Sequence, residues 1–181
     1  LLAALGDPDE SVRKAAAKAI GALRHEEFLL PLFHLLRDKS ETLREAAADA
    51  LRHMRNSSVV PELVPLLSDP AAPVRWQVAR ALESFGWAPD NNATAARFAV
   101  ARGKIEEAAT YGPDAIEALT TVLLVGAYHQ RREAVTALCQ ISDARVIKAL
   151  LVALKDSDGQ VRSAAAEALS RIGDASCADA L

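Results

Sequence analysis

The chain has 181 residues, of which 51% are hydrophobic and only 4% aromatic, and its formal net charge is −3. Alanine and leucine supply most of the apolar content, which favours close-packed helices over strands. No run of 18 or more apolar residues predicts a membrane span. The slightly acidic balance argues against nucleic acid as the main partner. Two cysteines and no visible N-terminal leader predict a cytoplasmic protein without a disulfide framework.

Five segments of the chain share one pattern: 11–23, 42–54, 73–85, 129–141 and 160–172. Each has an arginine at its third position, with intervals of 31, 31, 56 and 31 residues: Arg13, Arg44, Arg75, Arg131 and Arg162. A leucine stands eight residues before each arginine, and an aspartate stands six residues before four of them: Asp7, Asp38, Asp69 and Asp156. In the fourth segment Val125 takes the aspartate's place. Ladders in register predict a repeat protein.

Each repeat is predicted to contain two helices. The first carries apolar residues at helical spacing, a turn rich in Asp, Pro and Gly follows, and the second begins near the ladder arginine. Pro31, Pro61 and Pro65 are expected to bend the first helices or mark their first turns. These features predict an all-α solenoid forming a single domain over residues 1–181. Its repeats are expected at about 1–25, 26–56, 57–87, 113–143 and 144–174.

The interval of 56 residues contains an extra 25 residues, which the spacing assigns to an insertion at about 88–112, between repeats three and four. The pattern predicts two short helices there, about 92–102 and 104–110. Asp90 or Asn91 can cap the first, and Gly103 can separate the two. Pro113 suits the first turn of the helix that resumes the array. The apolar side chains of the insertion disfavour a linker, and its lack of His and Cys disfavours a catalytic loop.

The pattern Asp-x-x-x-x-Val-Arg-x-x-Ala-x-x-Ala-Leu, with its period of about 30 residues, resembles the short HEAT-like repeat of the phycobilisome-lyase type. The resemblance covers about 150 residues. It implies that the ladder arginines and aspartates hydrogen-bond between the turns of successive repeats, so that Val125 marks a looser or differently bridged junction. It is specific for the fold and weak for function, because such repeats occur in proteins of many roles.

In HEAT repeats one face of the second helices lines a concave surface. The positions one, five and eight residues after each ladder arginine vary between repeats, whereas the core positions do not. Trp76 stands where the other repeats have charged or polar residues. Either it belongs to a protein-binding hot spot, or it packs against the irregular segment that follows repeat three. We predict these partner-binding residues: Trp76, Arg80, Glu83, Glu45, Asp49, His129 and Arg132.

No phosphate loop, catalytic constellation or metal-ligand spacing is found, so we expect no catalytic residues, no metal and no cofactor. Deoxyhypusine hydroxylases bind iron through repeated His-Glu pairs, and here only His25-Glu26 matches. The expected function is a non-catalytic interaction scaffold that binds a protein or peptide on its concave face. The alternative that the resemblance implies is a bilin lyase-type protein acting on phycobiliproteins. Nucleic-acid binding is less expected, because the predicted face mixes acidic and basic residues.

The two ends of the chain resemble parts of repeats. Residues 175–181 look like the start of a further repeat, which suggests a fragment of a longer array. Solenoids normally need polar capping repeats, so self-association through uncapped ends is expected.

Overall fold

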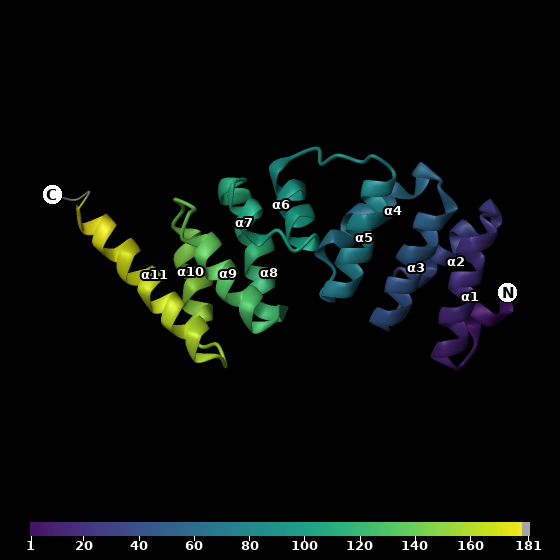
Figure 1. The fold of residues 1–181 in the computed structure, drawn as a ribbon, viewed down its shortest axis with the longest axis horizontal. Coiled ribbons are helices and arrows are strands. Elements are labelled where there is room, and N and C mark those ends of the chain that lie inside the picture. Colours follow the sequence, from purple (N-terminus) through teal and green to yellow (C-terminus); the bar gives the residue numbers. More distant parts are fainter. Residues whose placement is uncertain (179–181) are drawn as a thin grey trace. The chain divides into compact units, whose positions relative to one another are not determined.

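The computed structural model describes the backbone of residues 1–178 and the side chains of residues 1–173 (Figure 1). The chain divides into two compact units, Leu1–Ala88 and Pro89–Leu181. Every regular element in the described residues is a helix. The predicted all-α repeat fold is therefore confirmed, while the single-domain prediction and the repeat boundaries stay predictions. None of the described helices is long and apolar enough to cross a membrane.

The first unit contains three long helices, each the second helix of its repeat and each preceded by a turn with polar or proline residues. They are α1 (Glu10–Leu23), α3 (Glu41–Met54) and α5 (Ala72–Ser84). The shorter elements between and before them are η1 (Ala3–Gly6), η2 (Glu26–Phe28), α2 (Leu29–Leu35), η3 (Ser57–Val59), α4 (Val60–Leu63) and η4 (Val64–Ser68). Pro61 and Pro65 lie in the first turns of α4 and η4, which is one of the two roles predicted for them.

The helices α1, α3 and α5 pack side by side in sequence order (Figure 1). Apolar residues at helical spacing, such as Ile20, Leu51 and Leu82, are fully buried between them. Gly21 lies at the closest approach of α1 to α3: a Cβ atom there would be 2.6 Å from the Cα atom of Ala50. Any larger side chain at this position would push the two helices apart.

The second unit contains the predicted insertion and the last two repeats. Its elements are α6 (Asn92–Ala101), α7 (Ile105–Ala109), η5 (Gly112–Ala115), α8 (Ile116–Val125), α9 (Tyr128–Leu138), α10 (Arg145–Ala153) and α11 (Gly159–Ala178). One apolar core joins the insertion to the repeats, since Ala99 and Ile105 belong to the same buried cluster as Leu119 and Leu138. The insertion is therefore a packed part of this unit.

The local chemistry of the insertion also follows the prediction. The Asn91 side chain caps α6 by accepting a hydrogen bond from the Thr94 N–H at 2.9 Å. Gly103 separates α6 from α7 with φ of +74°, which suits glycine. Pro113 lies in the first turn of η5, directly before α8. The predicted start of a further repeat at 175–181 lies outside the part of the chain whose side chains are described. From residue 179 on, the backbone is outside the described residues as well.

Candidate functional site

The ladder residues hold the turns of the repeats in place. In four of the repeats, Nη1 of the ladder arginine donates to two backbone carbonyls five and six residues earlier: Arg13, Arg44, Arg75 and Arg162. Each ladder aspartate accepts the N–H two residues later at 2.8 Å, as Asp69 does from Ala71. This is an Asx turn, which fixes the bend between the two helices of a repeat.

Two ladder pairs also connect successive repeats. Arg44 donates from Nε and Nη2 to the two carboxylate oxygens of Asp69, at 2.7 and 3.0 Å. Arg131 does the same to Asp156 at 2.7 and 2.7 Å. These bidentate hydrogen bonds raise the pKa of Arg44, and those from Arg131 lower the pKa of Asp156. The side chains of Arg44 and Asp69 are 13% and 3% exposed.

The other ladder arginines differ. Arg13 forms no ion pair with Asp38 in the described structure, although the spacing of 25 residues is the same. Arg75 is 5% exposed, and its Nε atom has no hydrogen-bond partner among the described residues. Burial lowers the pKa of Arg75. Where Val125 replaces the aspartate, Nη1 of Arg131 bonds the Gly126 carbonyl at 2.9 Å.

The predicted partner-binding residues of the first unit lie on α3 and α5 and are exposed or partly exposed; we call the surface that they form the second-helix face. Trp76 on α5 is 47% exposed, so it is not a core residue. The guanidinium carbon of Arg80, one turn later, lies 4.6 Å from the centre of the Trp76 ring. This cation–π contact holds the indole in one orientation while leaving much of its surface open.

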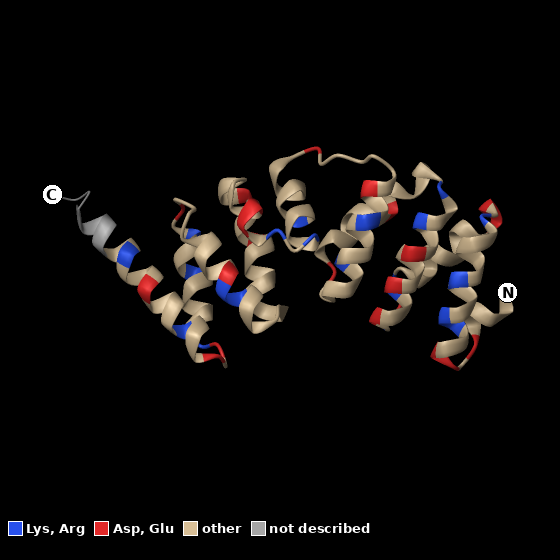
Figure 2. Cartoon of the chain, viewed as in Figure 1, with Lys and Arg blue, Asp and Glu red and all other residues tan. Residues whose placement is uncertain are grey.

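Charged residues surround this pair on the same face. On α3, Glu45 and Asp49 are partly exposed, and Asp49 accepts a hydrogen bond from Nη2 of Arg52 at 2.8 Å. On α5, Glu83 is exposed. Acidic and basic residues are mixed along α3, in the order Glu41, Arg44, Glu45, Asp49 and Arg52 (Figure 2). The face therefore offers an aromatic group among charges of both signs.

The remaining predicted residues, His129 and Arg132, lie on α9 of the second unit and are exposed. The His129 ring packs edge-on against Tyr128, with 5.5 Å between the ring centres. Nη1 of Arg132 donates to Gln160 on α11 at 3.1 Å. These two residues belong to the surface of the second unit, whereas the second-helix face belongs to the first unit.

Groups with the chemistry for catalysis or metal binding do not converge. In the described part of the chain, no three His, Cys, Asp or Glu residues lie close enough to hold a metal ion. His25 lies 3.8 Å from the Glu27 carboxylate at an exposed turn. Cys139 is half-buried against the core of the second unit, and burial raises the pKa of its thiol. That environment makes it a poor nucleophile.

Sequence reasoning missed two groups of surface residues. Leu124, Leu151 and Val152 on α8 and α10 are exposed beside a cavity of about 630 Å³. Arg24 and Arg55 follow the second helices of repeats one and two and line another cavity. Comparing equivalent positions would have revealed Leu124, because the residue after the ladder leucine is polar or glycine in the other repeats and leucine only at 124.

Several solved structures are similar to this chain. A phycocyanin lyase complex of CpcE and CpcF from Nostoc sp. PCC7120 matches with 25% identity and a TM-score of 0.48, over 95% of this chain and 75% of that chain. Human deoxyhypusine hydroxylase matches with 18% identity and a TM-score of 0.41, over 93% and 82%. A designed armadillo repeat protein in complex with the peptide (KR)4 matches with 21% identity and a TM-score of 0.39, over 93% and 79%.

No curated protein matches the chain. The family model for HEAT repeats matches three overlapping stretches that together span the chain, residues 1–83, 29–119 and 116–181. With the stacked helix pairs and the ladder hydrogen bonds described above, this match shows that the chain belongs to the HEAT repeat family.

Proposed function

We propose that this protein is a non-catalytic interaction scaffold that binds a protein or peptide through its second-helix face. The observation that carries the proposal is the half-exposed Trp76, held by Arg80 at the surface of α5. Large aromatic side chains and arginines contribute most of the binding energy in many protein interfaces. A tryptophan held in one orientation loses little conformational entropy when a partner covers it.

The charges around Trp76 define the kind of partner. Glu45 and Asp49 on α3 and Glu83 on α5 are acidic, whereas Arg80 and Arg52 are basic. A partner with one apolar side chain for the indole and charges of both signs around it would complement this face. A uniformly anionic partner such as nucleic acid would meet three carboxylates.

The test compares partner recovery with stability. The double variant Trp76→Ala/Arg80→Ala is immobilised beside the wild type and exposed to a lysate of the source organism. The matched control is Ser163→Ala/Glu167→Ala, which changes the equivalent exposed positions of repeat five. We expect the Trp76 and Arg80 variant alone to lose the partner, by at least about tenfold for a hot spot of about 2 kcal/mol.

Thermal unfolding of the same proteins separates binding from folding. A variant that keeps its unfolding midpoint and loses the partner supports the proposal. Equal recovery from the wild type and the Trp76 and Arg80 variant would refute it. A lowered unfolding midpoint with full recovery would show that the indole serves packing.

A further inference from the structure

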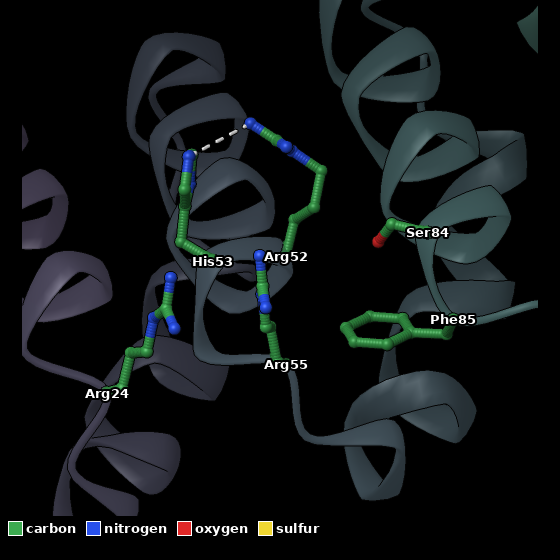
Figure 3. A pocket seen from close by; sticks show the side chains of 6 residues that line it. All are labelled: Arg24, Arg52, His53, Arg55, Ser84 and Phe85. Carbon is green, nitrogen blue, oxygen red and sulfur yellow. Dashed lines mark hydrogen bonds between the residues drawn. The ribbon is translucent and has the colours of Figure 1, made fainter.

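A cavity of about 400 Å³ opens at the C-terminal ends of the second helices of the first unit. Its lining residues are Arg24, Arg52, His53, Arg55, Ser84 and Phe85 (Figure 3). Three of the six are arginines and none is acidic. Figure 3 shows the guanidinium groups of Arg24 and Arg55 extending toward the side of α3 that carries His53 and Arg52.

Only one of the three arginines has a carboxylate partner. Arg52 donates to Asp49 from Nη2 at 2.8 Å and from Nε at 3.3 Å. Within the described residues, Arg24 and Arg55 form no ion pair with any carboxylate. The cavity therefore carries two positive charges that no described side chain neutralises.

His53 belongs to the same hydrogen-bonded group. Its Nδ1 atom lies 2.8 Å from the Asp49 carbonyl oxygen, and its Nε2 atom lies 3.2 Å from Nη2 of Arg52. A carbonyl oxygen only accepts and a guanidinium only donates. Nδ1 therefore carries the ring proton, and Nε2 accepts from Arg52. With Asp49, His53 fixes the Arg52 guanidinium at the edge of the cavity.

The backbone at Arg24 and Arg55 gives an independent indication. Both residues adopt the left-handed conformation, with φ of 58° and 54°, and they are the only non-glycine residues in the described chain with positive φ. At the equivalent place after α5, Gly86 has φ of 67°. Glycine adopts this conformation without a steric cost, whereas arginine does not.

An arginine that only complements the helix dipole does not need a left-handed backbone conformation, because a positive charge anywhere in the last turn of the helix has the same effect. Two arginines in an unfavourable backbone conformation, on neighbouring helices, extend into one cavity. Strained residues of this kind cluster at ligand-binding sites.

We propose that Arg24, Arg52 and Arg55 form a binding site for a phosphate monoester dianion. Two unneutralised guanidinium groups match its two negative charges, and the planar N–H forks of arginine suit its oxygens. The dianion is carried either by a phosphorylated side chain of a protein or by a small phosphorylated molecule. Phe85, beside the arginines, provides an apolar surface for the carbon atoms next to the phosphate. The site does not depend on the proposed function of Trp76.

Isothermal titration of the whole chain with inorganic phosphate, at constant ionic strength in a phosphate-free buffer, tests the site. We expect one phosphate per chain in the wild type. The variants Arg24→Gly and Arg55→Gly are expected to weaken binding at least tenfold each. Because glycine suits a positive φ, both variants should keep or raise the unfolding midpoint. The control Lys18→Gln removes one exposed positive charge from α1, outside the cavity, and should bind within about twofold of the wild type.

Two further ligands identify the source of the phosphate. A phosphoserine peptide that binds at least tenfold more tightly than inorganic phosphate, while its unphosphorylated form does not bind, indicates a protein ligand. Equal affinity for the peptide and for inorganic phosphate indicates a small molecule. Absence of phosphate binding, or equal weakening by Lys18→Gln and Arg55→Gly, overturns the proposal. Loss of stability in both glycine variants also overturns it, because the arginines would then serve the fold.

Discussion

The ion pair between Arg44 and Asp69 can be tested with one conservative substitution and a matched control. Asp69→Asn removes the charge and replaces one acceptor oxygen with an N–H donor facing the guanidinium. It retains an oxygen for the Ala71 N–H, so the Asx turn remains possible. Asp38→Asn makes the same change one repeat earlier, where the carboxylate accepts from the Ser40 N–H and receives no bond from a ladder arginine.

The expected loss follows from the geometry of the pair. Asp69→Asn removes one of two hydrogen bonds between charged groups, worth about 1.5–3 kcal/mol, and makes the other one weaker. It also leaves the charge of Arg44, whose side chain is 13% exposed, without its partner. Breaking a buried ion pair at one partner costs about 3–5 kcal/mol. Because Arg44 keeps its bonds to the carbonyls of Asp38 and Lys39, we expect the low end, about 3 kcal/mol.

Denaturant unfolding followed by circular dichroism measures the difference. In thermal unfolding, a loss of about 3 kcal/mol corresponds to a decrease of about 6–12 °C in the midpoint temperature of a chain of this size. Asp38→Asn is expected to cost at most about 0.5 kcal/mol, as for an ordinary surface substitution. If the two variants lose the same amount, the inter-repeat hydrogen bonds contribute nothing and the reasoning is wrong.

Three further predictions test other parts of the structure. Gly21→Ala should lower the unfolding midpoint by clashing with α3. Gly173→Ala, where an added Cβ atom would meet nothing within 4 Å among the described residues, should raise stability by about 1 kcal/mol; effects of the same sign would contradict the close helix contact. Hydrogen bonds hold the pKa of Asp156 below its ordinary 3.8, so its stabilisation is complete above that pH and lost as the pH falls through the lower folded value. The stability gap between wild type and Asp156→Asn should therefore close in acid, and a constant gap would exclude the linkage. Trp87→Phe leaves Trp76 as the only tryptophan, and acrylamide should quench its fluorescence strongly because the side chain is 47% exposed; weak quenching would show a covered indole.

Much of the fold could be predicted because the repeat constrains each position several times. The resemblance implied hydrogen bonds between the ladder arginines and aspartates of successive repeats, and the structure has two such pairs, Arg44 with Asp69 and Arg131 with Asp156. The same spacing relates Arg13 to Asp38, and that pair does not form. A fixed separation along the chain determines which turns are neighbours. It does not determine whether two side chains come within hydrogen-bond distance, which depends on the local packing of those helices.

The candidate surfaces were predicted less completely. Trp76 was identified because the equivalent positions of the other repeats carry charged or polar residues. In the structure it is half-exposed. Gly21, at an equivalent position to Arg52 and Glu83, is buried against α3. Arg24 was missed because its importance lies in a backbone angle, which the residue type does not indicate.

The hydrogen bonds of the ladder also determine how this protein can be lengthened. A second copy of residues 39–69, inserted directly after Asp69, would bring its own arginine and its own aspartate. Every Arg44-type side chain would again find a carboxylate 25 residues later and two turn carbonyls five and six residues earlier. The Asx turns would be regenerated at both joins, since Asp38 and Asp69 each bond the N–H two residues on. Tandem duplication of this 31-residue stretch is thus a route by which the array gains a repeat with its ladder hydrogen bonds already in place.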